Sequence, residues 1–239
     1  MDSAPTFAPF DLAHLVVIGL TIFLPVVFAG IARRFKTRLL DRVFRTAIAA
    51  LLIVNYLSYA VFRVNHGAAE WKEMLPFQLC DWTMFAVVVA LLTGGSPAWL
   101  EVAYFWGIGG SLQAILTPNL AFGFPDIRFL SFFADHCGIV IGVLYLMISR
   151  RFRPTTKSVW RTLVWSEIYL AVTLIVDRLT GVNYGFLLHK PEAFSILNYL
   201  SDWRPLYILQ LNGLALLFFA ILYMPFAVKD LVRVESDAR

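Results

Sequence analysis

Long apolar segments constrain this chain more than any other feature. Seven stretches are each long enough, at about 20 mostly apolar residues, for a helix to cross the hydrocarbon core of a bilayer. They are residues 12–32, 44–62, 75–93, 98–117, 127–149, 159–177 and 206–228. Only 15% of the 239 residues are charged, whereas a soluble protein carries about 25%. The sequence therefore predicts an all-α polytopic membrane bundle, with residues 1–239 forming a single transmembrane domain of seven helices.

Basic residues predict the direction of the chain, because cytoplasmic loops of membrane proteins are enriched in Lys and Arg. They are dense between the first two predicted spans, between the fifth and sixth, and after the last. These residues are Arg33, Arg34, Lys36, Arg38, Arg42, Arg45, Arg150, Arg151, Arg153, Lys157, Arg161, Lys229, Arg233 and Arg239. If the spans alternate in direction, all three regions lie on the inner side of a cell membrane. The N-terminus is then outside and the C-terminus inside. The net charge of +4 thus reports topology, and we expect no nucleic-acid partner.

The two cysteines, Cys80 and Cys137, both lie in apolar stretches. This placement argues against a disulfide framework and against a cysteine-based zinc site. The four histidines show no metal-ligand spacing either, so we expect no metal and no cofactor. The N-terminus lacks the basic region of a signal peptide, and we expect the first hydrophobic segment to be retained.

Polar side chains within the predicted spans gather near their outer ends. The main ones are Asn55, Ser58, Gln78, Cys80, Asp81, Gln113, Thr117, Asn119, Asp135, His136, Asp177 and Gln210. The inner halves of the third, fifth and seventh spans are plainer. Polar groups at membrane depth face a bundle interior or a wet cavity, and they are functional candidates by default. The alternative is hydrogen bonding between helices, worth about 0.6 kcal/mol per bond.

One face of the fifth predicted span carries small residues. Ser131, Asp135, Gly138 and Gly142 follow steps of four, three and four residues, a pattern that lets two helix backbones approach closely. We interpret this face as a packing surface without chemistry. His136 lies about 100° around the helix from Asp135, so we expect it to point toward a different neighbour.

Cys80 and His136 form a candidate pair of nucleophile and base. A thiol attacks as the thiolate, and a neighbouring imidazole can take its proton. Pro76 is suited to the first helical position, which would place Cys80 near the positive end of the third span. A helical rise of about 1.5 Å per residue puts Cys80 about 7 Å and His136 about 13 Å below the outer helix ends, a difference that helix tilt can close. The alternative is that both are ordinary core residues.

Four ordered blocks between residues 70 and 210 are distinctive. They read LPFQLCDW, GIGGSLQAILTPNLAFGFPD, FFADHCGI and TGVNYGFLLHKPEAFSILNYLSDWRPLY. They resemble the YwaF family of bacterial membrane proteins, which is related to the eukaryotic transmembrane protein 164. The resemblance implies a lipid acyltransferase that moves a fatty acyl chain between phospholipid and lysophospholipid through a cysteine thioester in the outer half of the bilayer. Carried onto this chain, the cysteine is Cys80 and the assisting histidine is His136, and the implied partners are membrane phospholipids and lysophospholipids.

Other polar residues have candidate supporting roles around this pair. Gln78, Gln113 or Asn119 could donate hydrogen bonds to an oxyanion. Asp81 or Asp177 could orient the imidazole. Asp81 could instead serve only to bond a neighbouring helix.

The connection from Arg178 to Pro205 is about 28 residues long, whereas helix connections in bundles usually run to about 2–8 residues. Its polar residues Asn183, Tyr184, Lys190 and Arg204 could contact a lipid headgroup. Alternatively, the segment is an interfacial flap that seals the bundle.

Three readings of the function remain open from the residues. The first is the acyltransferase, and the same Cys–His pair gives a phospholipase-type hydrolase when water is the acceptor. The second is a non-enzymatic protein that binds or transports a small ligand in an outward-facing cavity. The third is a structural membrane protein without a site. A transporter would need a polar path that continues toward the inner side of the membrane. The inner halves of the third, fifth and seventh spans are mostly apolar and do not provide one.

Overall fold

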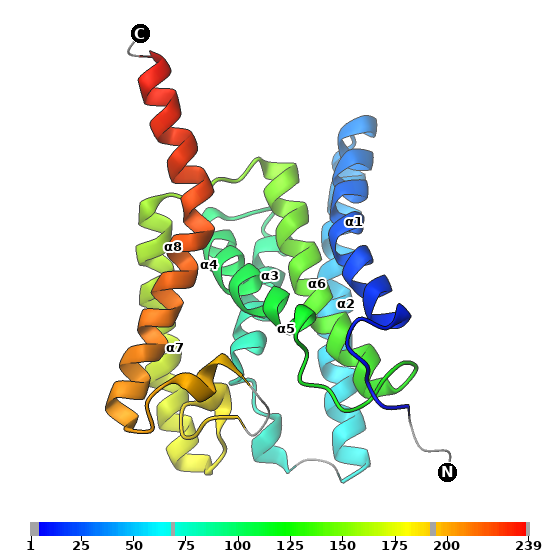
Figure 1. Cartoon of the computed structure of the whole chain (residues 1–239). Helices are drawn as coiled ribbons and strands as arrows, with labels where there is room; N and C mark the ends of the chain where they lie inside the picture. The colour runs from blue at the N-terminus through cyan, green and yellow to red at the C-terminus, as the bar shows by residue number, and fades with distance from the viewer. Residues whose placement is uncertain (1–4, 68–69, 192–194, 238–239) are drawn as a thin grey trace. The chain divides into compact units, whose positions relative to one another are not determined.

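The computed structural model describes residues 5–67, 70–191 and 195–237 (Figure 1). These residues form helices and no β-strand, apart from one isolated antiparallel bridge between Thr6 and Phe122. The helices are α1 (Leu12–Phe35), α2 (Arg38–Asn65), η1 (Trp71–Met74), α3 (Leu79–Leu92), α4 (Pro97–Trp106), η2 (Gly107–Ser111), α5 (Leu112–Leu116), α6 (Ile127–Arg150), α7 (Thr156–Thr180), η3 (Tyr184–Phe186), η4 (Ile196–Tyr199) and α8 (Arg204–Asp237). The chain forms two compact units, the first comprising Met1–Pro76 and Cys80–Phe152, the second Phe77–Leu79 and Arg153–Arg239.

All seven predicted apolar segments contain helix, which confirms the all-α membrane class. Among the described residues, the helices long and apolar enough to cross a membrane are α1, α2, α6, α7 and α8. The third segment was predicted to begin at residue 75, but α3 begins at Leu79. Leu75 is extended because a residue that precedes proline, here Pro76, disfavours the helical region. The seven-span count, the single transmembrane domain and the outside position of the N-terminus stay predictions.

Side-chain caps fix where the long helices start. Asp11, Thr37, Asp126 and Thr155 each accept a backbone hydrogen bond from the first turn of α1, α2, α6 and α7 respectively. Such caps satisfy amides that have no partner within the helix. Hydrogen bonds from Arg128 lower the pKa of the Asp126 carboxyl, so this cap stays ionised at neutral pH and is lost only in acid. Helices α1 and α6 begin at Leu12 and Ile127, the residues at which the first and fifth predicted spans begin.

The fourth predicted span is a helix interrupted by a π turn. Residues 97–116 are helical throughout, but the sequence Gly-Ile-Gly-Gly-Ser at Gly107–Ser111 forms the π segment η2. π turns occur frequently at functional sites. A Cβ added at Gly107 would lie 3.2 Å from Ile139 and Val143 of α6 and 3.7 Å from Thr83 of α3. The π turn therefore packs directly against both α3 and α6.

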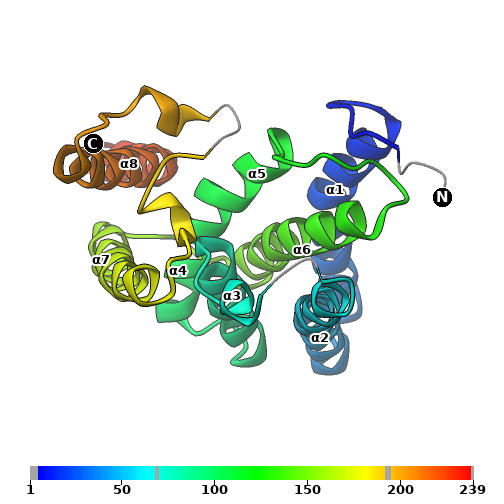
Figure 2. The ribbon, with the colours of Figure 1, turned by 90° about the horizontal axis from the view of Figure 1, so that it is seen from below.

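Helix α6 is the central element of the first unit. Figure 2 shows it between α1 and α2 on one side and α3, α4 and α5 on the other, and α6 contacts α1, α2, α4, α5 and η2. In the most apolar 18-residue stretch of α6, 61% of the residues are buried, whereas the corresponding share is 17% in α1 and in α2. The outer helices thus expose apolar side chains, as helices facing lipid do, while α6 supplies the interior.

The small-residue face of α6 packs as predicted. A Cβ on Gly138 would lie 2.8 Å from Leu52 of α2, and one on Gly142 would lie 2.8 Å from Val87 of α3. Both glycines therefore allow contacts that a larger residue would prevent. Close packing of this kind is the main source of association between helices in lipid.

Arginines gather at one end of the first unit. Arg33 donates to the last turn of α6, Arg45 to the last turn of α3, and Arg150 to the Gly94 carbonyl just after α3. Asp41 accepts hydrogen bonds from both Arg45 and Arg150. Cations are favourable at helix C-termini, where carbonyls lack partners. The basic ends of α1, α2 and α6 thus share one end of this unit, in agreement with the predicted alternation of these helices.

The second unit consists of α7, α8 and the connection between them. Helices α7 and α8 contact each other, and Arg153, just before α7, forms an ion pair with Asp230 near the end of α8 at 2.8 Å. The two helices therefore run antiparallel. The segment Phe77–Leu79 belongs to this unit, where the Phe77 carbonyl accepts a hydrogen bond from the Tyr169 hydroxyl at 3.1 Å.

The substitution Gly142→Ala tests the packing of α6. We expect it to destabilise the protein by about 1–3 kcal/mol, because the added methyl group overpacks the contact with Val87. The measurement is thermal unfolding of the purified protein in detergent. Gly19→Ala is the matched control, since nothing lies within 4 Å of a Cβ at Gly19. Equal unfolding temperatures for the two variants would contradict the packing role of this face.

Candidate functional site

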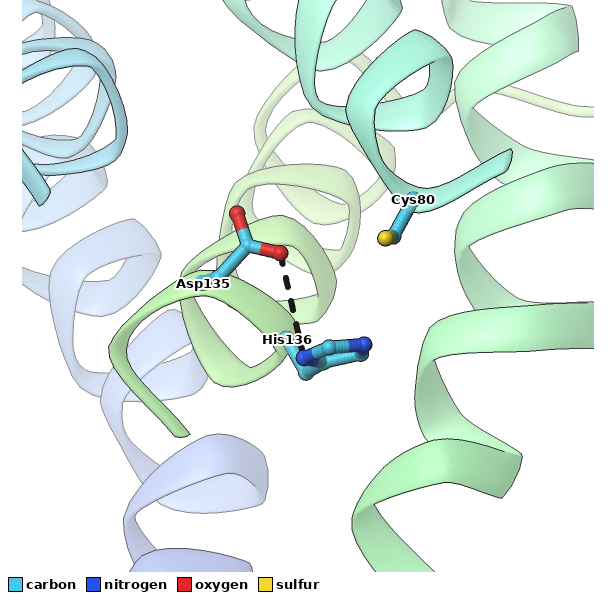
Figure 3. A group of neighbouring side chains, drawn as sticks. All are labelled: Cys80, Asp135 and His136. Carbon is cyan, nitrogen blue, oxygen red and sulfur yellow. Dashed lines mark ion pairs between the residues drawn. The ribbon is translucent and has the colours of Figure 1, made fainter. Parts of the chain in front are cut away.

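Three side chains from two helices meet in the first unit. Cys80 follows Leu79, the first residue of α3, while Asp135 and His136 lie on α6. The Cys80 sulfur, one carboxylate oxygen of Asp135 and one ring nitrogen of His136 all lie within 4.8 Å of one another, and each residue is partly exposed (Figure 3). The structure thus brings together the cysteine and histidine that the sequence paired, and it adds a carboxylate.

The His136 ring is held in a defined orientation. Its Nδ1 lies 2.9 Å from the Phe132 carbonyl oxygen, and the ring stacks on Phe132 with centroids 4.3 Å apart. A carbonyl only accepts hydrogen bonds, so Nδ1 carries the proton of the neutral ring and Nε2 carries the lone pair. His136 therefore offers Nε2 as a base or a ligand atom.

Asp135 places a carboxyl group beside this ring. Its Oδ2 lies 3.8 Å from His136 Nδ1, which Figure 3 marks with a dashed line. This distance is too long for a hydrogen bond, and the contact becomes an ion pair when His136 is protonated. A carboxylate in that position stabilises the imidazolium that forms when His136 takes a proton.

The prediction that His136 points to a different neighbour from Asp135 was wrong, because both side chains lie beside Cys80. The angle of about 100° between consecutive residues separates the two Cα–Cβ bonds, but both side chains still reach the start of α3. Sequence reasoning missed Asp135 because the small-residue pattern explained it already. The available signal was an acidic residue directly before a histidine within an apolar helix, since such residues are rare and functional at membrane depth.

The Cys80 sulfur lies at the N-terminus of its helix. The predicted start near Pro76 was wrong, and α3 begins so late that Cys80 falls in the first turn. The helix dipole at this end favours a negative charge. Burial of the residue and the nearby Asp135 carboxyl group oppose one. The thiol therefore depends on a base to become a thiolate.

Two of the five supporting candidates lie in the second unit. The Gln78 side-chain oxygen accepts a hydrogen bond from the Gly185 amide at 3.1 Å. Asp177 is fully buried and accepts from the Tyr184 amide at 2.9 Å. Each thus helps to hold the connection after α7, and neither belongs to the group around Cys80.

The other three supporting candidates are in the first unit. Asp81 occupies the first turn of α3, where a carboxylate is favourable to the helix dipole. Gln113 on α5 and Asn119 in the following loop are exposed. None of them is in the group drawn in Figure 3, and their roles in catalysis stay predictions.

The connection after α7 uses its polar residues mainly to hold itself together. Asn183 bonds to the backbone and ring of His189. Lys190 donates to two backbone carbonyls and to the Asp202 carboxylate. Tyr184 is buried, whereas Arg204 is exposed at the start of α8. Contact of these four candidates with a lipid headgroup stays a prediction.

The fold and this group define a multi-pass helical membrane protein with a cysteine–histidine–aspartate cluster near the start of a membrane helix. A family model matches residues 9–223, and the chain belongs to the TMEM164 family. The match covers most of the chain and confirms the relationship indicated by the four sequence blocks. A search of curated proteins found no match, and neither did a search of solved structures.

The two cysteines are expected to differ in reactivity. A small thiol electrophile such as N-ethylmaleimide should modify Cys80 about tenfold faster than Cys137 or more, because Cys137 is buried whereas Cys80 is partly exposed and has His136 nearby as a base. Mass spectrometry of peptides after timed labelling measures both rates. His136→Gln should slow only the labelling of Cys80. Faster labelling of Cys137 would contradict the assignment.

Proposed function

We propose that this protein is a membrane-embedded lipid acyltransferase that moves a fatty acyl chain between phospholipid and lysophospholipid through a thioester on Cys80. The observation that carries the proposal is the meeting of a thiol and an imidazole, from two helices, within 4.8 Å in an apolar helical unit. Membership of the TMEM164 family and the lipid-facing apolar surfaces of α1 and α2 support a substrate that arrives from the bilayer.

The first half-reaction acylates the cysteine. His136 takes the Cys80 proton on Nε2, and the sulfur attacks an ester carbonyl of the phospholipid. The tetrahedral intermediate collapses with cleavage of the ester C–O bond, and the imidazolium returns the proton to the departing lysophospholipid hydroxyl. The Asp135 carboxylate stabilises the imidazolium while it exists. The positive end of α3 lies beside the reacting carbonyl and favours its developing negative charge.

The second half-reaction regenerates the thiol. The hydroxyl of an acceptor lysophospholipid gives its proton to His136 and attacks the thioester carbonyl. The C–S bond breaks, and the Cys80 sulfur recovers the proton from the imidazolium. If water is the acceptor, the same group is a lipid hydrolase, so access to the thioester decides between the two activities.

Removal of either member of the pair tests the proposal. Cys80→Ala and His136→Gln should each lower acyl transfer about 100-fold or more, because one loses the nucleophile and the other the base. The assay uses the full chain in nanodiscs, a phospholipid with a labelled acyl chain and an unlabelled lysophospholipid acceptor. Labelled phospholipid product indicates transfer, and labelled free fatty acid indicates hydrolysis.

Matched controls come from the same chain. Cys137→Ala and His66→Gln change the other cysteine and an exposed histidine, and both should keep wild-type rates. Wild-type activity in Cys80→Ala would refute the thioester, whatever the controls show.

Asp135→Asn tests the carboxylate separately. Removal of the charge with little change in shape should slow acylation of Cys80 about tenfold, because the imidazolium loses its stabilising partner. Single-turnover formation of labelled acyl-enzyme measures this step. Asp81→Asn is the comparison, since Asp81 is the next residue after Cys80 but not in the group. A larger loss in Asp81→Asn would assign the supporting role to Asp81 instead.

A further inference from the structure

We propose that Cys80, Asp135 and His136 also form a binding site for a soft divalent cation such as Zn²⁺, and that the bound cation blocks the thiol chemistry. The binding site rests on the geometry of the group alone. The block on turnover rests in addition on the proposed acyltransferase function.

The donor atoms and their spacing suit this class of ion. A thiolate sulfur, an imidazole nitrogen and a carboxylate oxygen are the three ligand types that zinc takes in proteins. Three atoms within 4.8 Å of one another leave a central point no more than about 2.8 Å from each (4.8 Å divided by √3). Zinc bonds are about 2.0–2.3 Å long. Side-chain shifts of less than about 1 Å would therefore complete the site.

The orientation of His136 is that of a metal ligand. A histidine that binds metal almost always donates its other ring N–H to a carbonyl, a carboxylate or water. Nδ1 of His136 lies 2.9 Å from the Phe132 carbonyl and leaves Nε2 for an ion. The stacking on Phe132 holds the ring in place. The outer support of a metal site is thus already present.

Asp135 gives an independent reason to expect a cation. No described residue donates a hydrogen bond to its carboxylate, and the nearest ring nitrogen of His136, which faces the Phe132 carbonyl, is 3.8 Å away. A charged group in apolar surroundings costs free energy unless it is paired or binds a metal. A divalent ion bound to one thiolate, one carboxylate and one neutral imidazole has a net charge of zero, which suits a membrane interior.

The chemistry of the cation explains the block. Calcium and magnesium prefer sites made only of oxygen ligands, so the sulfur and nitrogen donors favour zinc-like ions. Binding displaces the thiol proton to the buffer and engages the sulfur lone pair in a metal–sulfur bond. His136 Nε2 is occupied at the same time, so neither the nucleophile nor the base is available.

Cobalt titration tests the site without any assay of activity. Co²⁺ added to the purified full-length protein in detergent should produce sulfur-to-metal charge-transfer absorption, and Zn²⁺ should displace it. Cys80→Ser should abolish this absorption, and Asp135→Asn and His136→Gln should each weaken binding about tenfold or more. Cys137→Ser and His66→Gln should bind as the wild type does. Absorption that is absent in the wild type, or that persists in Cys80→Ser, would overturn the site.

Acyl transfer measured with Zn²⁺ and then with a chelator tests the block. Inhibition should follow the same Zn²⁺ affinity and reverse on chelation. Full activity at saturating Zn²⁺, or activity that requires Zn²⁺, would overturn this part. The two proposals fail separately: cobalt binding without any transfer removes the acyltransferase, and Cys80-dependent transfer without cobalt binding removes the metal site.

Discussion

The close approach of α6 to α2 and α3 is the contact on which the first unit depends. Gly138 and Gly142 leave room for Leu52 and Val87, and Gly107 of the π turn fits against Ile139 and Val143 from another helix. Of these contacts, the one between Gly142 and Val87 joins α6 to α3. Asp135 lies seven residues before Gly142, and Cys80 lies seven residues before Val87, so this contact and the site join the same two helices. Glycine positions that carry no chemistry themselves thus help to bring the site together.

Polar residues in this protein form two groups. One group hydrogen-bonds to the backbone of neighbouring segments, and the other lies around Cys80. Gln78, Asp177 and Lys190 hold the backbone of the connection after α7 through hydrogen bonds within the second unit. Asn55 likewise donates to the Ser131 carbonyl and ties α2 to α6. Cys80, Asp135 and His136 differ from these residues, because their closest polar neighbours include one another. Packing alone gives no reason to place a thiol, a carboxylate and an imidazole together.

The sequence predicted the helices well because hydrophobic length is a local signal. The pairing of Cys80 with His136 followed from chemistry and from the family resemblance. The start of α3 was misplaced because Pro76 can begin a helix as well as prevent one before it. The π turn at Gly107 and the proximity of Asp135 to Cys80 were missed for a shared reason. Both depend on how closely a second helix approaches, and the pattern within one helix does not contain that distance.

The charges of the site connect the two proposed kinds of chemistry. A carboxylate within 4.8 Å of a sulfur opposes a thiolate, since two negative charges at such a distance repel strongly in a medium of low dielectric constant. In the proposed acyl transfer this cost is offset only after His136 has gained a proton, when Asp135 stabilises the imidazolium. The proposed divalent cation would remove the conflict altogether, because it pairs with both negative groups at once. The carboxylate that disfavours the thiolate therefore favours a cation at the same three residues.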